Sequence, residues 1–363
     1  MVTTTFAEGS ERNKALGVWG AVSGSGGAAG VLLGGVLTEY LGWEWVLWVN
    51  VPIGIVAALL APRLLQESRR EDQARTFDAL GAITVTAGLS LLVFALVDTI
   101  NAGWDSTQTI LLLAVAAALI AVFVVTELRS RAPLMPFRIF RSPTLTGANL
   151  VGLLVGAALF AMFFFLSRYM QDVLGYDALE AGLSYLPLAL VIIVSAGIAS
   201  QLVTKLGFKP VLVSGLVLVT IALLWFARLP VDGSYVADLL GPMVVAAFGL
   251  GFAFVPVMIA AVSRISADDS GLASGLINTS QQVGGALGLA VLGTIASSHT
   301  TGAVTAAQGD PAAVPTALTE GFQLAFLAGA GFAVLAIVAT LALVRDRDSR
   351  EIVGARPAEV PIA

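Results

Sequence analysis

Long apolar runs separated by short polar segments dominate this sequence. Ten charge-free windows each approach the roughly 20 residues that a helix needs to cross a bilayer. They are 15–38, 45–62, 79–97, 106–126, 142–167, 181–204, 210–227, 239–263, 273–297 and 321–344. The alternating segments of about ten residues that mark a transmembrane barrel do not occur. Because lipid leaves backbone groups no other partners, the pattern predicts an all-α polytopic membrane protein with ten transmembrane helices.

The basic residues between the windows predict the orientation of the chain. All but two of the 19 Lys and Arg residues fall in segments on one side, and the exceptions are Arg168 and Arg228. Basic residues concentrate in cytoplasmic loops, so we expect a multi-pass protein of the cell membrane with both termini in the cytoplasm. The first 14 residues lack the apolar core of a signal peptide.

The composition excludes several classes of function. Only 12% of residues are charged, against about 25% in soluble domains, and hydrophobic residues make up 57%. There is no Cys and a single His, His299, which argues against thiolate, zinc–thiolate, haem and multi-His metal chemistry. No basic surface with interleaved aromatics suggests nucleic acid. We therefore expect no cofactor, no catalytic residue, no metal and no enzyme activity.

The first window is rich in glycine. Gly26, Gly30 and Gly34 are spaced by four and share one face, a pattern that lets a neighbouring helix approach closely. Plain packing and a sliding or sealing interface in a moving protein both fit this stripe. Residues 15–30 align with 273–288, and such internal repeats are a feature of secondary transporters.

Several segments now resemble those of a known family, the 14-helix drug:proton antiporters of the major facilitator superfamily. Residues 30–35, GVLLGG, resemble an antiporter glycine signature that includes Gly34 and Gly35, although Val31 replaces its proline. Residues 43–54 and 271–293 resemble two further family segments. The other matching positions are Asn50, Pro52, Asp78, Gln171, Gly182 and Pro187. The matches follow the family's order along nearly the whole chain.

The resemblance implies a partial major facilitator fold that lacks the family's first four helices. The N-terminal half would consist of a cytoplasmic segment (1–14), two helices of the N-terminal bundle (15–66) and an inserted helix pair with its preceding loop (67–126). A cytoplasmic amphipathic linker (127–142), a complete C-terminal six-helix bundle (143–344) and a tail that we expect to be disordered (345–363) would follow. We also expect a flexible outer loop over 298–320, and that Met1 is an internal or misassigned start.

Polar residues inside the windows are neutral, and they suit a substrate cavity. Asn278 and Gln282 are four apart on one helical face with Gln281 beside them, and Asn149 lies in another window. Amides in hydrocarbon face protein or water, so these four either join helices or orient a substrate. Met162 and Phe163 are candidates for contact with an apolar substrate.

The windows hold no ionisable residue that could carry a proton. Asp78, Asp98, Glu127 and Arg168 flank window ends, where a solvated side chain is the ordinary interpretation. The resemblance implies proton-coupled export of hydrophobic or amphiphilic small molecules, as in multidrug or antibiotic efflux. The alternative is a non-transporting membrane remnant, or one part of a split transporter whose partner chain supplies the missing helices. The lipid bilayer, a small-molecule substrate and protons are then the expected partners.

Overall fold

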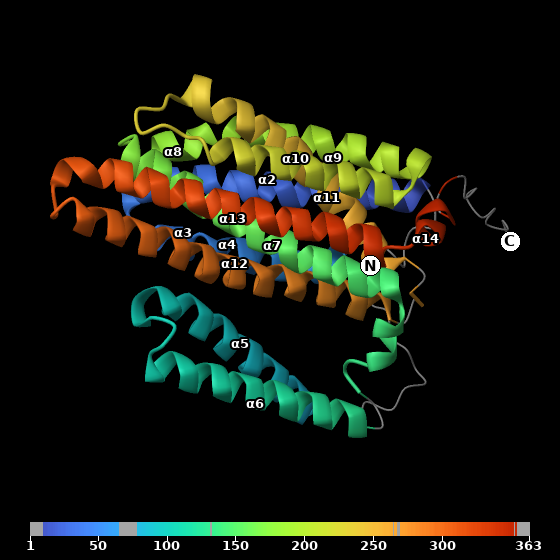
Figure 1. Cartoon of the computed structure of the whole chain (residues 1–363). Helices are drawn as coiled ribbons and strands as arrows, with labels where there is room; N and C mark the ends of the chain where they lie inside the picture. Colours follow the sequence, from blue (N-terminus) through green and yellow to red (C-terminus); the bar gives the residue numbers. More distant parts are fainter. Residues whose placement is uncertain are drawn as a thin grey trace, which may run out of the picture.

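The chain folds into long helices that lie side by side (Figure 1). The computed structural model describes residues 10–64, 78–130, 133–263, 265–266, 269–351 and 353. Within this described part, nine helical segments are long and apolar enough to cross a membrane. The first predicted window falls in a further helix, α2 (Ser10–Leu41), of which Leu32–Leu41 is a shorter apolar helix. The protein is therefore an all-α, multi-pass membrane protein, as the hydropathy pattern predicts.

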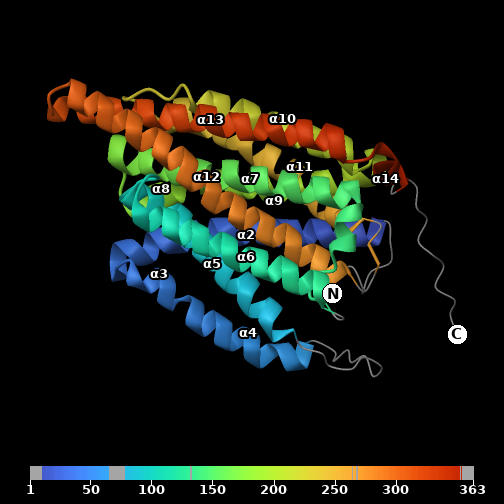
Figure 2. The same ribbon diagram turned by 60° about the horizontal axis from the view of Figure 1, so that its bottom comes forward.

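The N-terminal helices have few neighbours. Helix α2 has 32 residues, which corresponds to about 48 Å at 1.5 Å per residue, and it packs on α8, α9 and α11. It is followed by α3 (Glu44–Trp48) and α4 (Asn50–Leu64), neither of which has a buried residue. Figure 2 shows α3 and α4 at the edge of the molecule. This part of the chain thus leaves much apolar surface uncovered by the described residues.

Helices α5 (Ala79–Ala102) and α6 (Thr107–Arg129) form an antiparallel pair beside the main bundle (Figure 1). Asp78 caps the start of α5 and Ser106 caps the start of α6. Gly103, at φ 82°, makes the turn between the two helices. Helix α5 packs against α12, which attaches the pair to the C-terminal bundle.

The C-terminal bundle contains six long helices. They are α7 (Pro143–Arg168), α9 (Leu186–Leu206), α10 (Phe208–Phe226), α11 (Leu240–Val262), α12 (Ser270–Ala306) and α13 (Val314–Leu343). Shorter elements join or extend them. These are η1 (Phe137–Arg141), η2 (Tyr169–Val173), α8 (Ala178–Ser184), η3 (Tyr235–Leu239), η4 (Pro311–Ala313) and α14 (Asp346–Glu351). Phe165, Phe226 and Phe326 pack together in the larger core of this bundle.

Two segments differ from their sequence-based expectations. The predicted flexible loop over 298–320 is mostly helix, because α12 continues to Ala306 and α13 begins at Val314. The two helix ends support each other, since the Thr300 hydroxyl donates to the Ala317 carbonyl over 3.1 Å. Extension of both helices leaves only a short connection with one 3₁₀ turn.

The tail that we expected to be disordered from residue 345 begins with a docked helix, α14. The Thr144 hydroxyl donates to the Asp348 carboxylate, and the Lys209 backbone N–H donates to the Ser349 hydroxyl over 2.9 Å. Asp348 and Ser349 are both buried. Contacts with α7 and α10 therefore order the first turns of this polar segment, and residues 354–363 lie outside the described residues.

Candidate functional site

Helices α7 and α12 meet along a seam where glycines allow backbone contact. A Cβ at Gly284 would overlap the Leu153 carbonyl oxygen, and one at Gly288 would overlap the Ala157 carbonyl oxygen. On the facing helix, a Cβ at Gly156 would overlap the Gln281 carbonyl oxygen. Side chains larger than hydrogen would push the two helices apart, so these glycines fix the distance between α7 and α12.

Two of the predicted amides lie at this seam. The Ser280 hydroxyl donates to Asn149 Oδ1 over 3.0 Å, while Asn149 Nδ2 donates to the Leu145 carbonyl over 2.9 Å. Asn149 is 8% exposed, so its amide joins α7 to α12 in this conformation. Gln281 also lies against α7, and its Nε2 is buried without a hydrogen-bond partner. A buried amide donor without a partner is unusual, because most buried polar groups in proteins are hydrogen-bonded.

The other two amides lie on an open face of α12. Asn278 and Gln282 are exposed, and Thr279 and Gly275 extend the same exposed face at helical spacing. Asn278 Nδ2 donates to the Ser274 carbonyl of its own helix over 2.9 Å. Asn278, Thr279 and Gln282 form what we call the α12 polar face.

The two predicted apolar contacts occupy different environments. Met162 is 2% exposed and belongs to the core of the C-terminal bundle. Phe163 is partly buried and stacks on Tyr185 with the ring centroids 5.3 Å apart. The Tyr185 hydroxyl donates to the Phe163 carbonyl over 3.1 Å, so this aromatic pair fixes α7 against the start of α9. Tyr185 was not predicted, because a Tyr near a helix start gives no sequence signal of this contact.

The glycines of helix α2 differ in how closely other helices approach them. No described atom lies within 4 Å of a Cβ built at Gly26, Gly30 or Gly34. At Gly35 a Cβ would lie 2.6 Å from the Ala178 carbonyl oxygen, so α2 approaches α8 closely there. The repeat predicted between 15–30 and 273–288 therefore has a closely packed C-terminal copy and an N-terminal copy whose glycine stripe is open.

Most residues at the family-motif positions lie near helix ends and shape or stabilise those ends. Asn50 Nδ2 donates to the Val46 carbonyl over 3.0 Å, and the exposed Pro52 follows in the first turn of α4. Gln171 is exposed, and its Nε2 donates to the Ser167 hydroxyl over 2.9 Å. Gly182 is buried in α8, and Pro187 stands in the first turn of α9, where its missing N–H costs no helical hydrogen bond.

A carboxylate pair at the end of the α5–α6 helix pair was not predicted. Glu127 is 3% exposed, although the sequence suggested a solvated side chain, and its Oε2 accepts from the Met135 backbone N–H over 3.0 Å. A Cβ at Gly81 would lie 2.8 Å from Glu127 Oε1 and 3.0 Å from the Asp78 carboxyl carbon. Asp78 Oδ1 accepts from the Gly81 N–H, whereas Asp78 Oδ2 and Glu127 Oε1 are buried without partners. Two carboxyl groups thus face the same small space.

Comparison with known proteins identifies the family of this chain. The sequence pattern of the Major Facilitator Superfamily matches residues 1–289. The chain is 41% identical over 305 residues to the cephamycin export protein CmcT of Amycolatopsis lactamdurans, a match that covers 83% of this chain and 63% of that protein. It is 35% identical over 346 residues to the puromycin resistance protein pur8 of Streptomyces alboniger, covering 94% of this chain and 68% of that one. The chain thus spans less than two thirds of the cephamycin exporter.

A solved structure shares the fold. It is an inward-facing, occupied bacterial homologue of the human lysosomal transporter Spinster, with a TM-score of 0.50 and 17% identity, and the match covers 74% of this chain and 66% of that one. The family consists of transporters rather than enzymes, which confirms the prediction that the chain is not an enzyme. By its sequence pattern and its relatives, the chain belongs to the Major Facilitator Superfamily.

Proposed function

We propose that this chain acts in the export of hydrophobic or amphiphilic small molecules by alternating access, as drug or antibiotic efflux. The α12 polar face is the observation that carries the proposal, since Asn278, Thr279 and Gln282 are exposed on one face of a membrane helix. Neutral polar side chains in membrane helices face protein or water rather than lipid. A water-accessible substrate cavity satisfies that requirement, and relatives named for cephamycin export and puromycin resistance support a drug-like substrate.

In this proposal the amides orient the substrate and the seam between α7 and α12 moves. Asn278 and Gln282 supply hydrogen bonds from the polar face, and Phe163 offers an aromatic surface. Asn149 and Gln281 lie at the seam, where Gln281 Nε2 has no partner. Rearrangement of the seam would present both amides to a substrate, while Met162 stays in the core.

We further propose that the chain forms part of a 14-helix transporter with cytoplasmic termini. Gly26, Gly30 and Gly34 are uncovered among the described residues, and α4 has no buried residue. The first four helices of the resembled family, which would come before residue 15 of this chain, would cover this surface. They come from one continuous transporter or from a separate chain, which is the split-transporter alternative.

Protons are the proposed coupling ion, with the coupling group on those further helices. The predicted windows contain no Asp, Glu, Lys, Arg or His, so the α12 polar face binds substrate without carrying a proton itself. Export should then require both the additional helices and a proton gradient. For a non-transporting remnant, neither the additional helices nor a proton gradient would produce export.

Expression in an efflux-deficient bacterial host tests the proposal. The chain is produced alone and together with a fragment carrying the four helices that the family has before residue 15, and cellular accumulation of puromycin is measured. We expect the fragment to lower accumulation, a protonophore to restore it, and the pair N278A and Q282A to abolish the effect. T305A, on an exposed part of the same helix, is the matched control. Unchanged accumulation with the fragment present would favour the remnant.

A further inference from the structure

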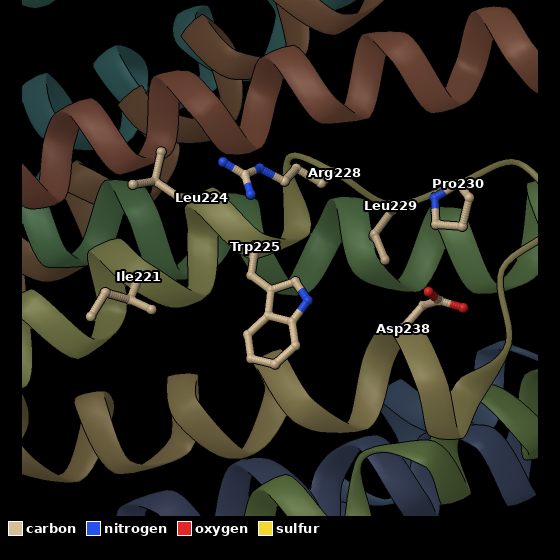
Figure 3. A pocket seen from close by; sticks show the side chains of 7 residues that line it. All are labelled: Ile221, Leu224, Trp225, Arg228, Leu229, Pro230 and Asp238. Atoms are coloured by element: carbon tan, nitrogen blue, oxygen red, sulfur yellow. The ribbon is translucent and has the colours of Figure 1, made fainter.

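A cavity of about 370 Å³ opens at the end of α10 opposite Lys209 (Figure 3). It is lined by Ile221, Leu224, Trp225, Arg228, Leu229, Pro230 and Asp238. Four of these residues, Ile221, Leu224, Trp225 and Arg228, follow i, i+3, i+4 and i+7 spacing and therefore share one face of α10 and its extension. The face runs over about 10 Å from aliphatic through aromatic to cationic side chains. A phospholipid at a membrane interface is complementary to this face, because its acyl chain would lie against the apolar end and its phosphate against the cationic end.

Two residues that line this cavity, Leu229 and Pro230, accept hydrogen bonds from other elements. Gln323 of α13 donates from Nε2 to the Leu229 carbonyl over 2.7 Å, and the Tyr169 hydroxyl donates to the Pro230 carbonyl. The Trp225 indole packs on α11, where a Cβ at Gly241 would lie 3.0 Å from the ring. Contacts from η2, α11 and α13 thus support three residues that line the cavity, Trp225, Leu229 and Pro230.

Two opposite charges line the cavity without forming an ion pair with each other. Arg228 makes no ion pair within the described part of the chain, whereas Arg168, the other basic residue predicted for this side, pairs with Asp172 at 2.7 Å. Figure 3 shows the Arg228 side chain extending toward Leu224, with the Asp238 carboxyl group on the Pro230 side. Asp238 Oδ2 accepts from the Ser234 backbone N–H over 2.7 Å, which leaves its other oxygen available.

We propose that this cavity binds a phospholipid whose headgroup carries both a phosphate and a primary ammonium group. The phosphate binds the Arg228 guanidinium, the ammonium binds the Asp238 carboxylate, and an acyl chain lies along Ile221 and Leu224, which are 47% and 41% exposed. An anionic headgroup without an amine fits less well, because it has no positive group to pair with the Asp238 carboxylate, which repels its negative charge. This site is separate from the proposed substrate face on α12 and does not depend on transport.

Lipid binding to the purified full chain tests the proposal. Phosphatidylethanolamine, phosphatidylcholine and phosphatidylglycerol with identical acyl chains are titrated into delipidated protein in detergent, and bound lipid is counted by native mass spectrometry. We expect the primary-amine lipid to bind most tightly. Because a charge-assisted hydrogen bond contributes about 1.5–3 kcal/mol, R228Q should weaken its binding about tenfold or more. Water-soluble glycerophosphoethanolamine should not bind at the same concentrations, since it lacks the acyl chain.

Matched variants make the result decisive. D238N keeps an oxygen for the Ser234 N–H but loses the charge, so it should remove the preference for phosphatidylethanolamine over phosphatidylcholine. R168Q, at the ion-paired arginine, should leave lipid binding unchanged, and R228K should retain most of it. Circular dichroism confirms that each variant is folded. Equal binding of the three lipids, tighter binding of phosphatidylglycerol, or an R228Q variant that binds like the wild type would overturn the proposal.

Discussion

The indole Nε1 of Trp104 donates a hydrogen bond to the Thr294 hydroxyl over 2.8 Å, which joins the turn between α5 and α6 to α12. Thr294 in turn donates to the Ala290 carbonyl of its own helix over 2.8 Å, so its lone pairs are directed toward the indole. Helix α5 also packs along α12. The α5–α6 pair is therefore attached to the helix that carries the proposed substrate face, and we expect the pair to move with α12.

Removal of the acceptor at Thr294 should loosen this attachment. T294V keeps the side-chain shape and deletes a hydrogen bond whose net contribution is about 1 kcal/mol, so backbone amides in the turn at 103–106 should exchange about fivefold faster. Hydrogen–deuterium exchange measured by mass spectrometry detects the change. T305V is the control, because the Thr305 hydroxyl bonds only to the Thr301 carbonyl within α12. Equal exchange in both variants would show that Trp104 does not anchor the pair.

The glycine seam should tolerate no side chain on its packed face. G284A forces a methyl group against the Leu153 carbonyl, and such overpacking costs about 1–3 kcal/mol of unfolding free energy. G275A, on the open face of the same helix, meets no described atom within 4 Å and should gain about 0.5–1 kcal/mol from helix propensity. Unfolding in mixed micelles compares the two variants with the wild type. Destabilisation of the same size in both would contradict the packed seam.

The hydrogen bond from Ser280 to Asn149 should stabilise the same seam. S280A leaves Asn149 Oδ1 without its donor at a site that is 8% exposed, and an unsatisfied buried acceptor costs about 1–3 kcal/mol. S274A removes a hydroxyl that bonds only to the Ser270 carbonyl within α12, so its effect should stay within about 0.5 kcal/mol. Both free energies come from the same unfolding assay. If S280A is as mild as S274A, Asn149 is satisfied in another way and remains a better candidate for substrate contact.

The sequence predicted where the helices of this protein lie better than it predicted which helices pack against each other. Apolar runs near 20 residues long identify membrane helices because lipid restricts the backbone so strongly, and helical spacing placed Asn278 and Gln282 on one face, as the structure has them. Which glycines would be packed could not be predicted. Gly26 and Gly284 occupy equivalent positions of the repeat, yet within the described part of the chain only Gly284 has a helix against it.

Polar contacts between distant segments also left no local signal. The ordered start of the tail depends on Thr144, which lies 204 residues before Asp348 in the sequence. Glu127 is buried because the chain turns back after α6 and brings the Met135 N–H to its carboxylate. Periodicity describes one helix at a time, so it cannot report a contact that a following loop creates.

Glu127 also provides a test of the carboxylate pair at Gly81. In E127Q the amide keeps an oxygen for the Met135 N–H and gains an NH₂ group that can donate to the unpartnered Asp78 Oδ2. Since a satisfied hydrogen bond contributes about 0.5–1.5 kcal/mol, E127Q should be as stable as the wild type or more stable by that amount. E127A leaves the Met135 N–H without its acceptor and should lose about 1–3 kcal/mol. Thermal unfolding of both variants, with E39Q at an exposed carboxylate as the control, measures the difference. Equal destabilisation by E127Q and E127A would mean that Oε1 requires a full charge, and the proposed donation to Asp78 would then be wrong.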